Sequence, residues 1–386
     1  MASDDLMLDL ESADAPPLET GSPEAIEHTR QRVNDVIERL VDRYSSGDGR
    51  PWIVGFSGGK DSTLLLHCVY AAVQRTAPRR RTRPVWVLSS NTLVESPQVL
   101  SFVRQNLHDI EVATQADGLP IEINMVEPQL NDTFFVKVLG YGYPAPNKWF
   151  RWCTDRLKIQ PANRFIQSRI AEGNEVVLLL GTRYDESITR ARSVRKHEGE
   201  WELNAHSTLK GALVFAPIKH LLTEEVWEFL TTNPPPWGGS HLPLRNMYRD
   251  ANAGDCPLVV DETTAPCGNS RFGCWTCTVV DRDKSMEGFV ASGRDEYQLL
   301  LNFRDELQRV RNDEGSREEF RRNGKPGLGP LKMEVRKRLL DDLLKLQNDL
   351  GEELIDPLQV SEIRKIWLAD ATSDIFTDRD LRAVAE

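Results

Sequence analysis

The sequence predicts an α/β protein built on a doubly wound parallel sheet. Short apolar runs of strand length alternate with longer segments whose apolar residues recur at helical spacing. The strand-like runs are apolar at successive positions instead of at every second one, which indicates strands buried on both faces. Strands of this kind, separated by helices, are typical of a parallel sheet covered by helices on both sides.

The elements follow one another regularly along the first two thirds of the chain. An amphipathic helix over 25–44 comes before the first strand. The expected order is then strand 52–56, helix 61–74, strand 85–88, helix 97–115, strand 121–126, helix 161–171, strand 176–180, strand 214–218 and helix 223–230. Doubly wound sheets bind ligands at the carboxyl ends of their strands, so the loop after strand 52–56 is expected at the binding edge.

Changes in composition divide the chain into four regions. Residues 1–24 are acidic and rich in Ala and Pro, which predicts a disordered tail, and 25–232 form the sheet domain. Residues 233–290 are rich in Pro, Gly and Cys and are expected to lack regular structure over most of their length. Residues 291–386 form a helical region with helices over 296–312, 334–349 and 360–368.

Composition limits the class of protein. The 386 residues are 40% hydrophobic, enough for a normal core, and no run resembles a signal peptide or a membrane span. A cytoplasmic protein without membrane contact is expected, in which the six cysteines are thiols or metal ligands. The net charge of −11 argues against non-specific nucleic-acid binding by the whole surface and leaves room for local basic clusters, such as the one at Arg321, Arg322 and Lys325.

The segment between strand 52–56 and the next helix has the composition of a phosphate-binding loop. Ser57, Gly58 and Gly59 allow the backbone to curl, so that several N–H groups and the positive end of the helix face one anion. Lys60 adds a cation and Ser62 a hydroxyl donor. The standard P-loop needs four residues between its glycines and Ser or Thr after its lysine, and this loop has neither feature.

The six residues from Ser57 to Ser62 resemble the SGGKDS loop of the ATP pyrophosphatases. That resemblance implies binding of ATP, cleavage between its α and β phosphates, and adenylation of a substrate oxygen. Such a reaction needs a divalent cation to neutralise pyrophosphate, and Asp61 is a candidate partner for Mg2+. A cap of the following helix is the alternative role of Asp61.

Four of the six cysteines lie within twenty-two residues, with the spacing C-x10-C-x6-C-x2-C. Four thiolates in a segment with little other means of folding predict a metal site. Zinc favours two C-x2-C pairs and this segment has one, whereas iron–sulfur clusters accept more varied spacing, so the spacing leaves both metals open. The expected ligands are Cys256, Cys267, Cys274 and Cys277.

Residues 267–280, which read CGNSRFGCWTCTVV, resemble the cysteine segment of the DndC family of DNA phosphorothioation proteins. With the phosphate loop and two further blocks, the resemblance covers roughly residues 25–290. It implies an adenine nucleotide α hydrolase-like, Rossmann-like fold and a [4Fe-4S] cluster on the four cysteines. It also implies a DNA substrate, a cysteine desulfurase as sulfur donor and companion DNA sulfur modification proteins.

Two further blocks resemble nucleotide-binding segments of the same superfamily. The first, RWCTDRLK over 151–158, supplies Arg156 and Lys158 as cations suited to phosphate oxygens. The second, GTRYDES over 181–187, directly follows a strand and includes Glu186, with Arg190 shortly after. Arg183 and Arg190 are expected to neutralise charge during α-phosphate transfer. The alternative for each arginine is an ion pair with Asp185 or Glu186.

Cys153 stands apart from the four clustered cysteines. Arg151, Arg156 and Lys158 flank it, and cationic neighbours lower the pKa of a thiol. A role as a sulfur carrier, holding a persulfide, is therefore one hypothesis. The other is a small packed residue beside Trp149 and Trp152.

Together these features predict an enzyme that adenylates a DNA backbone phosphate so that sulfur replaces a non-bridging oxygen. A tRNA thiolase would use the same chemistry on a base carbonyl. A sulfonucleotide reductase shares the fold, but those enzymes rely on a cysteine near their C-terminus, and the last cysteine here is Cys277. A nucleotide-sensing DNA-binding scaffold with a structural metal site is the alternative without catalysis.

Overall fold

The computed structural model describes residues 21–46, 48–173, 175–184, 203–251 and 272–383, with the backbone alone for 371–383. Of the tail predicted over residues 1–24, residues 1–20 lie outside the described part of the chain. The first helix, α1 (Pro23–Ser45), begins with Pro in its first turn, and its N-cap Ser22 accepts a hydrogen bond from the N–H of Ala25.

A single sheet with the order β3-β2-β1-β4-β6-β5 forms the centre of the sheet domain. Its strands are β1 (Trp52–Gly55), β2 (Val85–Ser90), β3 (Ile121–Val126), β4 (Val176–Leu179), β5 (Asn204–Ala205) and β6 (Ala212–Phe215). The first four and β6 pair in parallel, and β5 pairs antiparallel with β6 at the edge. The predicted α/β class with a doubly wound parallel sheet is therefore confirmed, and the short antiparallel edge strand is an addition.

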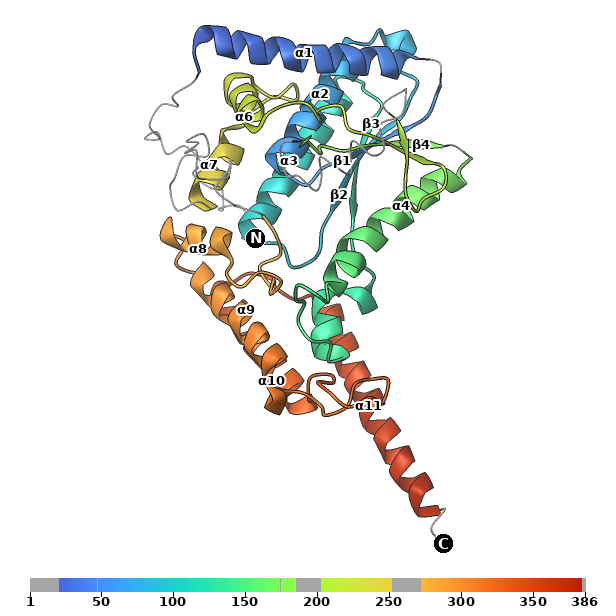
Figure 1. Ribbon diagram of the computed structural model, residues 1–386, viewed down its shortest axis with the longest axis vertical. Coiled ribbons are helices and arrows are strands. Elements are labelled where there is room, and N and C mark those ends of the chain that lie inside the picture. Colours follow the sequence, from blue (N-terminus) through green and yellow to red (C-terminus); the bar gives the residue numbers. More distant parts are fainter. Residues whose placement is uncertain (1–20, 47, 174, 185–202, 252–271, 384–386) are drawn as a thin grey trace, which may run out of the picture.

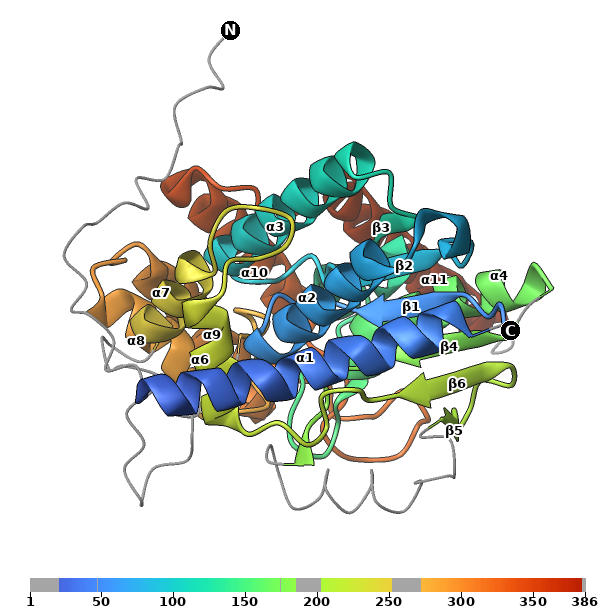
Figure 2. The same cartoon turned by 90° about the horizontal axis from the view of Figure 1, so that it is seen from above.

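Helices cover both faces of this sheet (Figure 2). Ile53 of β1 packs into the smaller core with Ile166 of α4 (Gln160–Ala171), whereas Val54 packs into the larger core. The larger core includes α1 and three further helices, namely α2 (Lys60–Arg75), α3 (Pro97–Ala116) and α6 (Thr223–Thr232). Burial of successive residues on opposite faces explains why the strand is apolar at every position.

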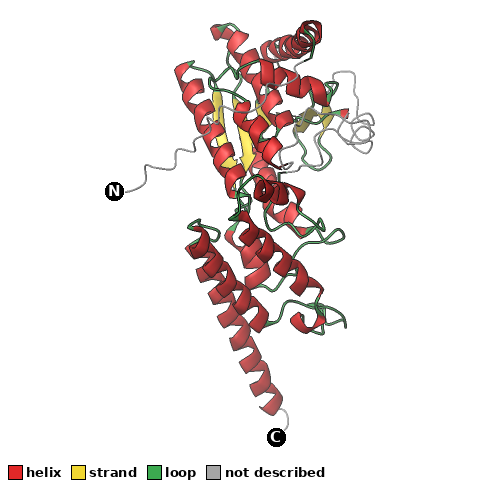
Figure 3. Ribbon diagram, turned by 90° about the vertical axis from the view of Figure 1, so that its left-hand side faces the viewer, coloured by secondary structure: helices red, strands yellow, loops and turns green. Residues whose placement is uncertain are grey.

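The helical C-terminal region continues the larger core (Figures 1 and 3). It comprises α8 (Lys284–Ala291), α9 (Tyr297–Asn312), α10 (Met333–Leu350) and α11 (Pro357–Ala383). The indole N–H of Trp367 on α11 donates to the carbonyl oxygen of Leu139, at 2.8 Å, in a π-helical turn that follows β3. Among the described helices, none combines the length and the apolar character that crossing a membrane requires.

Two details after β4 were not expected from the sequence. The segment 233–290 contains the helix α7 (Leu242–Ala251), because Leu244, Met247 and Tyr248 present an apolar face at helical spacing to the core, and α8 begins within it. The last parallel strand covers 212–215 instead of 214–218. The position of this strand is set by its pairing with β4, in which Leu179 lies opposite Phe215. A short window of sequence does not show this pairing.

The order of the strands places the predicted phosphate loop at the ligand-binding edge. The chain runs from β1 to β2 and β3 on one side, and β4 lies on the other side of β1. This reversal creates a crevice at the carboxyl ends of β1 and β4, where doubly wound proteins bind their ligands. Residues 56–59 follow β1 and residues 180–184 follow β4, so both segments meet at this crevice.

A buried histidine pair beneath α7 leads to a prediction about stability against pH. His67 and His241 lie with Nδ1 and Nε2 3.4 Å apart. Burial, helped by the neighbouring His241 and by Arg75, lowers the pKa of His67 to about 3, and burial lowers the pKa of His241 to about 4. Between about pH 4 and 6.5, both rings are therefore neutral in the folded protein, whereas in the unfolded chain they are protonated.

Stability is accordingly expected to fall as pH drops from about 6.5 towards 4, by at most about 1.4 kcal/mol per pH unit for each histidine. Urea unfolding between pH 4 and 7 measures this slope. His67→Leu is expected to reduce the slope by one histidine's share, whatever its effect at neutral pH. The control variant is His28→Leu, at an exposed position on α1. Equal slopes for wild type and His67→Leu would contradict the prediction.

Candidate active site

The phosphate loop has a shape that only glycine permits at its centre. Gly58 has a φ of 73°, and a Cβ on it would lie 2.4 Å from Cγ2 of Val103 on α3. Positive φ and lack of space both exclude larger residues. The loop is thereby packed against α3 and directed to the start of α2.

Hydroxyl groups brace the loop from inside. The N–H of Ser57 donates to Oγ of Ser62 at 3.2 Å, and that hydroxyl donates to the carbonyl oxygen of Gly59 at 2.9 Å. Oγ of Ser57 lies 3.1 Å from Oγ of Ser62. Gly59 is the N-cap of α2 and offers no side chain, so no side chain of the N-cap residue occupies the N–H groups of the first turn, which can bind an anion. Tyr248 of α7 covers this turn, and its hydroxyl accepts from the N–H of Lys60 at 3.4 Å.

Asp61 lies between two cations at the start of α2. Its Oδ2 is 2.9 Å from Nζ of Lys60, and its Oδ1 accepts from Nε of Arg183 at 2.6 Å. Because Gly59 is the N-cap, Asp61 does not cap the helix, which removes one of its two predicted roles. Its carboxylate instead orients Lys60 and joins α2 to the segment after β4.

Arg183 has a different place from the predicted one. The sequence suggested that it faces the α-phosphate, but it is 0% exposed. Besides Asp61, it donates from Nη1 to the carbonyl oxygen of Leu221 and from Nη2 to Oγ1 of Thr223, both at 2.9 Å. Each of its three nitrogens thus has a protein acceptor, so Arg183 is a positioning residue that holds Asp61 against α6. Glu186 and Arg190, from the same block, lie outside the described residues.

Gly181 allows the close approach that makes this arrangement possible. A Cβ at this position would lie 2.9 Å from the carbonyl oxygen of Asp61 and 3.0 Å from its carbonyl carbon. Both are backbone atoms at the start of α2 and move only with the loop. The glycine of the GTRYDES block therefore serves packing of the strand end against the phosphate loop.

Gly181→Ala is expected to weaken ATP binding about 10-fold, since overpacking of this kind costs about 1–3 kcal/mol and displaces the loop. Isothermal titration with a non-hydrolysable ATP analogue measures the change. Gly315→Ala is the control, because its Cβ would meet nothing closer than 3.4 Å and its φ is not positive. Unchanged affinity of Gly181→Ala would contradict the close contact.

Arg156 and Lys158 lie on a π-helical turn, Thr154–Ile159, before α4. Arg156 donates to Oδ1 of Asp132 at 3.3 Å, and Nζ of Lys158 is 3.6 Å from Oε1 of Glu95. Both side chains are nearly half exposed. They are engaged by carboxylates at the surface and remain within reach of an added anion.

Cys153 precedes this turn and does not have the expected low pKa. Burial raises the pKa of its thiol, a hydrogen bond with Thr154 opposes the rise, and the nearby Cys277 adds to it. Of the three cations expected to stabilise its thiolate, Arg156 pairs with Asp132 and Lys158 with Glu95. The expected low pKa of Cys153 is therefore not found, its role as a sulfur carrier stays a prediction, and the influence of Cys277 places Cys153 close to the cysteine segment.

The C-x2-C pair lies against the segment that follows β2. The N–H of Cys277 donates to the carbonyl oxygen of Cys274 at 3.0 Å, which closes a turn, and Sγ of Cys274 is 3.4 Å from Oγ1 of Thr92. The N–H of Trp275 donates to the carbonyl oxygen of Val94, also at 3.0 Å. Since β2 is the neighbour of β1, this turn lies at the same edge of the sheet as the phosphate loop.

The described half of the cysteine site fits a thiolate-bound metal centre in its chemistry. Burial, with a contribution from Glu95, raises the pKa of Cys274 to about 12, as expected of a dry site that becomes favourable for thiolate when a cation binds. Cys256 and Cys267, the other two predicted ligands, lie outside the described residues. Within the described residues there is no group of three or more His, Cys, Asp and Glu side chains close enough to hold a metal ion.

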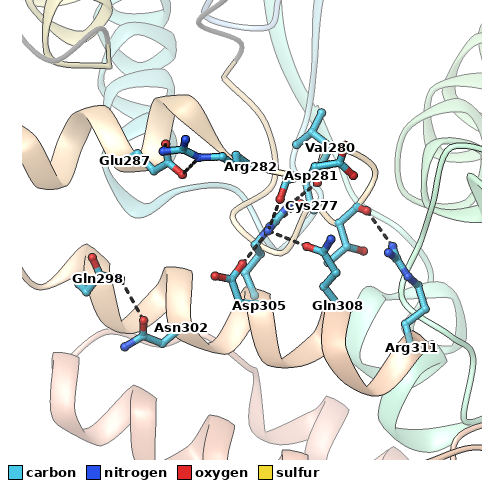
Figure 4. Close-up of polar contacts among 12 residues, drawn as sticks. Cys277, Val280, Asp281, Arg282, Glu287, Gln298, Asn302, Asp305, Gln308 and Arg311 are labelled. Carbon is cyan, nitrogen blue, oxygen red and sulfur yellow. Dashed lines mark hydrogen bonds and ion pairs between the residues drawn. The ribbon is translucent and has the colours of Figure 1, made fainter. Parts of the chain in front are cut away.

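Two buried arginines of α9, Arg304 and Arg311, hold the segment after Cys277, and neither was expected from the sequence. Figure 4 shows Arg311 beside this segment. Arg304 is 2% exposed and donates to the carbonyl oxygens of Cys277 and Asp281, both at 3.0 Å, and to that of Val280. Arg311 donates to the carbonyl oxygen of Thr278 at 2.8 Å. The two arginines are seven residues apart and therefore share the buried face of α9, a pattern that was available in the sequence.

Fold and site together define a doubly wound α/β protein with a glycine-rich loop and a cysteine turn at one sheet edge. Residues 51–280 match the family model of the phosphoadenosine phosphosulfate reductase domain. This chain belongs to that family.

Comparison with individual proteins gives more distant similarities. An uncharacterized protein of Methanocaldococcus jannaschii is 28% identical over 188 residues, which are 49% of this chain and 33% of that protein. The chain thus spans about a third of the length of this curated relative.

Two solved structures are among those to which this chain is similar. A phosphoadenylyl-sulfate reductase of Candida auris is 16% identical, with a TM-score of 0.35, covering 59% of this chain and 93% of that one. The U34-tRNA thiolase NcsA of Methanococcus maripaludis with its [4Fe-4S] cluster is 11% identical, with a TM-score of 0.34, covering 72% and 80%.

Proposed function

We propose that this chain adenylates a backbone phosphate of DNA with ATP and so prepares a non-bridging oxygen for replacement by sulfur. One observation carries the proposal. The phosphate loop after β1 and the C-x2-C turn against the segment after β2 occupy the same edge of the sheet. The proposed site of oxygen activation would thus be a neighbour of a thiol-rich turn, which supports a reaction that inserts sulfur.

In the first step, the first turn of α2 and Lys60 would hold the β and γ phosphates of ATP. A non-bridging oxygen of the DNA phosphate attacks the α-phosphorus, a new P–O bond forms, and the bond to pyrophosphate breaks. Lys60 leaves Asp61 for the phosphates at low cost, because Arg183 still neutralises that carboxylate. A persulfide from the desulfurase then attacks the DNA phosphorus, a P–S bond forms and AMP leaves with the original oxygen. A second thiol attacks the carrier's sulfur, which breaks the S–S bond, leaves the phosphorothioate on DNA and forms a disulfide.

Two cofactors would complete the site. Mg2+ would neutralise the pyrophosphate, and a [4Fe-4S] cluster on Cys256, Cys267, Cys274 and Cys277 would supply a metal–sulfur centre. A cysteine desulfurase is the proposed source of sulfur, and companion DNA sulfur modification proteins are the proposed partners.

Mass spectrometry of nuclease-digested DNA tests the proposal. Cells with this chain and its partners are expected to contain phosphorothioate dinucleotides, and cells with Lys60→Ala are expected to lack them. The same cells provide digested tRNA, in which loss of a thiolated base instead would identify a tRNA thiolase. Reduction of a sulfonucleotide by the purified protein would identify a reductase.

A further inference from the structure

We propose that the loop tip formed by residues 148–151, together with Arg322, is the DNA-contacting surface of this site, with Trp149 stacking on a base. The inference rests on the proposed function and adds to it the place where DNA binds. We refer to Lys148, Trp149, Phe150, Arg151 and Arg322 as the aromatic tip.

Exposure of Trp149 is the first observation. Its side chain is 95% exposed and that of Phe150 is 45% exposed, next to each other in the chain. Single exposed apolar side chains are common, but adjacent ones that form a patch can mark a binding surface. Indole and phenyl faces stack on nucleic-acid bases of any sequence, worth about 1–3 kcal/mol per base.

The tip is held in a fixed shape, so that DNA binding does not have to order it. Oδ1 of Asn147 accepts from the N–H groups of both Trp149 and Phe150, each at 2.8 Å. The ring of Phe150 stacks on Tyr143 with an interplanar angle of 16° and centroids 6.5 Å apart. A preformed turn of this kind lowers the entropy cost of binding.

The base of the loop is attached to the cysteine segment. The carbonyl oxygen of Pro146 accepts from Oγ1 of Thr278 at 2.6 Å and from Nη1 of Arg311 at 2.7 Å. Thr278 directly follows Cys277. A base stacked on Trp149 would therefore bring its backbone phosphate to the side of the molecule that carries the C-x2-C turn.

Positive charge surrounds the aromatic side chains. Arg322 lies over the rings of Tyr143, at 5.2 Å, and Tyr141, at 5.7 Å, and has no carboxylate partner among the described residues. Arg151 is exposed and also lacks a carboxylate partner within the described part of the chain. Lys148 forms one exposed pair, with Asp281 at 3.3 Å. Arginines with stacked aromatics on a chain of net charge −11 favour a polyanion with flat bases over an acidic peptide.

Fluorescence anisotropy with a labelled 20-nucleotide single-stranded DNA, whose base faces are accessible, tests the surface, using the full chain. Trp149→Ala is expected to raise the dissociation constant about 10-fold, and Trp149→Phe to restore most of the affinity. Arg322→Gln is expected to make the salt dependence shallower by about one unit in the logarithmic slope. Leu358→Ala, on the 67% exposed Leu358 of α11, is the matched control and is expected to bind as wild type does.

Each contrary outcome is distinct. Equal DNA affinity of Trp149→Ala and wild type would overturn the stacking role, and tighter binding of a single-stranded RNA of the same sequence would overturn DNA as the ligand. If Trp149→Ala weakens DNA binding while the wild-type protein releases no pyrophosphate from ATP, the surface stands and the proposed function fails.

Discussion

Replacing Lys60 with alanine is expected to lower kcat/KM for pyrophosphate release from ATP about 100-fold, the usual effect of removing one charged donor from a phosphoryl-transfer site. The side chain of Lys60 is 12% exposed and pairs only with Asp61 among the described carboxylates. Its removal leaves Asp61 paired with Arg183, so the loop is expected to keep its shape. A coupled assay for pyrophosphate measures the rate.

Lys365→Ala removes a lysine that is 70% exposed on α11 and provides the control. Thermal unfolding of both variants shows whether the fold is retained. Unchanged pyrophosphate release by Lys60→Ala would contradict phosphate binding by the loop lysine. Full DNA modification in cells with this variant would favour the non-catalytic scaffold.

Replacing Arg304 with leucine is expected to lower the free energy of unfolding by about 3 kcal/mol or more and to reduce the iron content of the protein. Arg304 is the common donor to the carbonyl oxygens of Cys277, Val280 and Asp281. Leucine fills part of the space but leaves these acceptors without a partner, at about 1–3 kcal/mol for each. The turn with Cys277 would lose its support at the same time.

Urea unfolding and iron analysis after anaerobic purification measure the two effects, with about four iron atoms per chain expected for wild type. Arg282→Leu is the control, because Arg282 is 77% exposed, pairs with Glu287 and lies only one residue beyond the segment that Arg304 holds. Arg304→Lys is expected to recover part of the stability with a single ammonium. Unchanged stability and iron in Arg304→Leu would contradict a supporting role, and a colourless zinc protein would contradict the cluster.

Local patterns were sufficient to predict most of the sheet domain. The helix over 61–74 is α2 (Lys60–Arg75), and the strands over 52–56 and 121–126 are β1 and β3 within one residue at each end. These elements bury apolar residues at a regular period that a short window of sequence shows. The edge strand β5 is two residues long, and its pairing with β6 depends on a turn that carries no such period.

The partners of charged side chains were much harder to predict. Arg183 was assigned to a phosphate because its block follows a strand, yet its acceptors are Asp61, 122 positions earlier, and groups about 40 positions later. Cys153 has cationic neighbours in sequence, but Arg156 and Lys158 turn to carboxylates from other loops. Coulomb interactions depend on distance in space and on burial, and neither follows from order along the chain.

The sequence alone determined the class of this protein. The alternation of strands and helices specified the sheet, and the glycines with Lys60 specified an anion site at the start of α2. Four clustered cysteines predicted a metal site. Only the tertiary structure decided which charges are free to meet a ligand. It buried Arg183 against Asp61, brought Arg304 to the carbonyl oxygen of Cys277, and left Trp149 in solvent. The reason is physical: backbone pattern is a local property, whereas desolvation and pairing of side chains arise only when distant segments pack together.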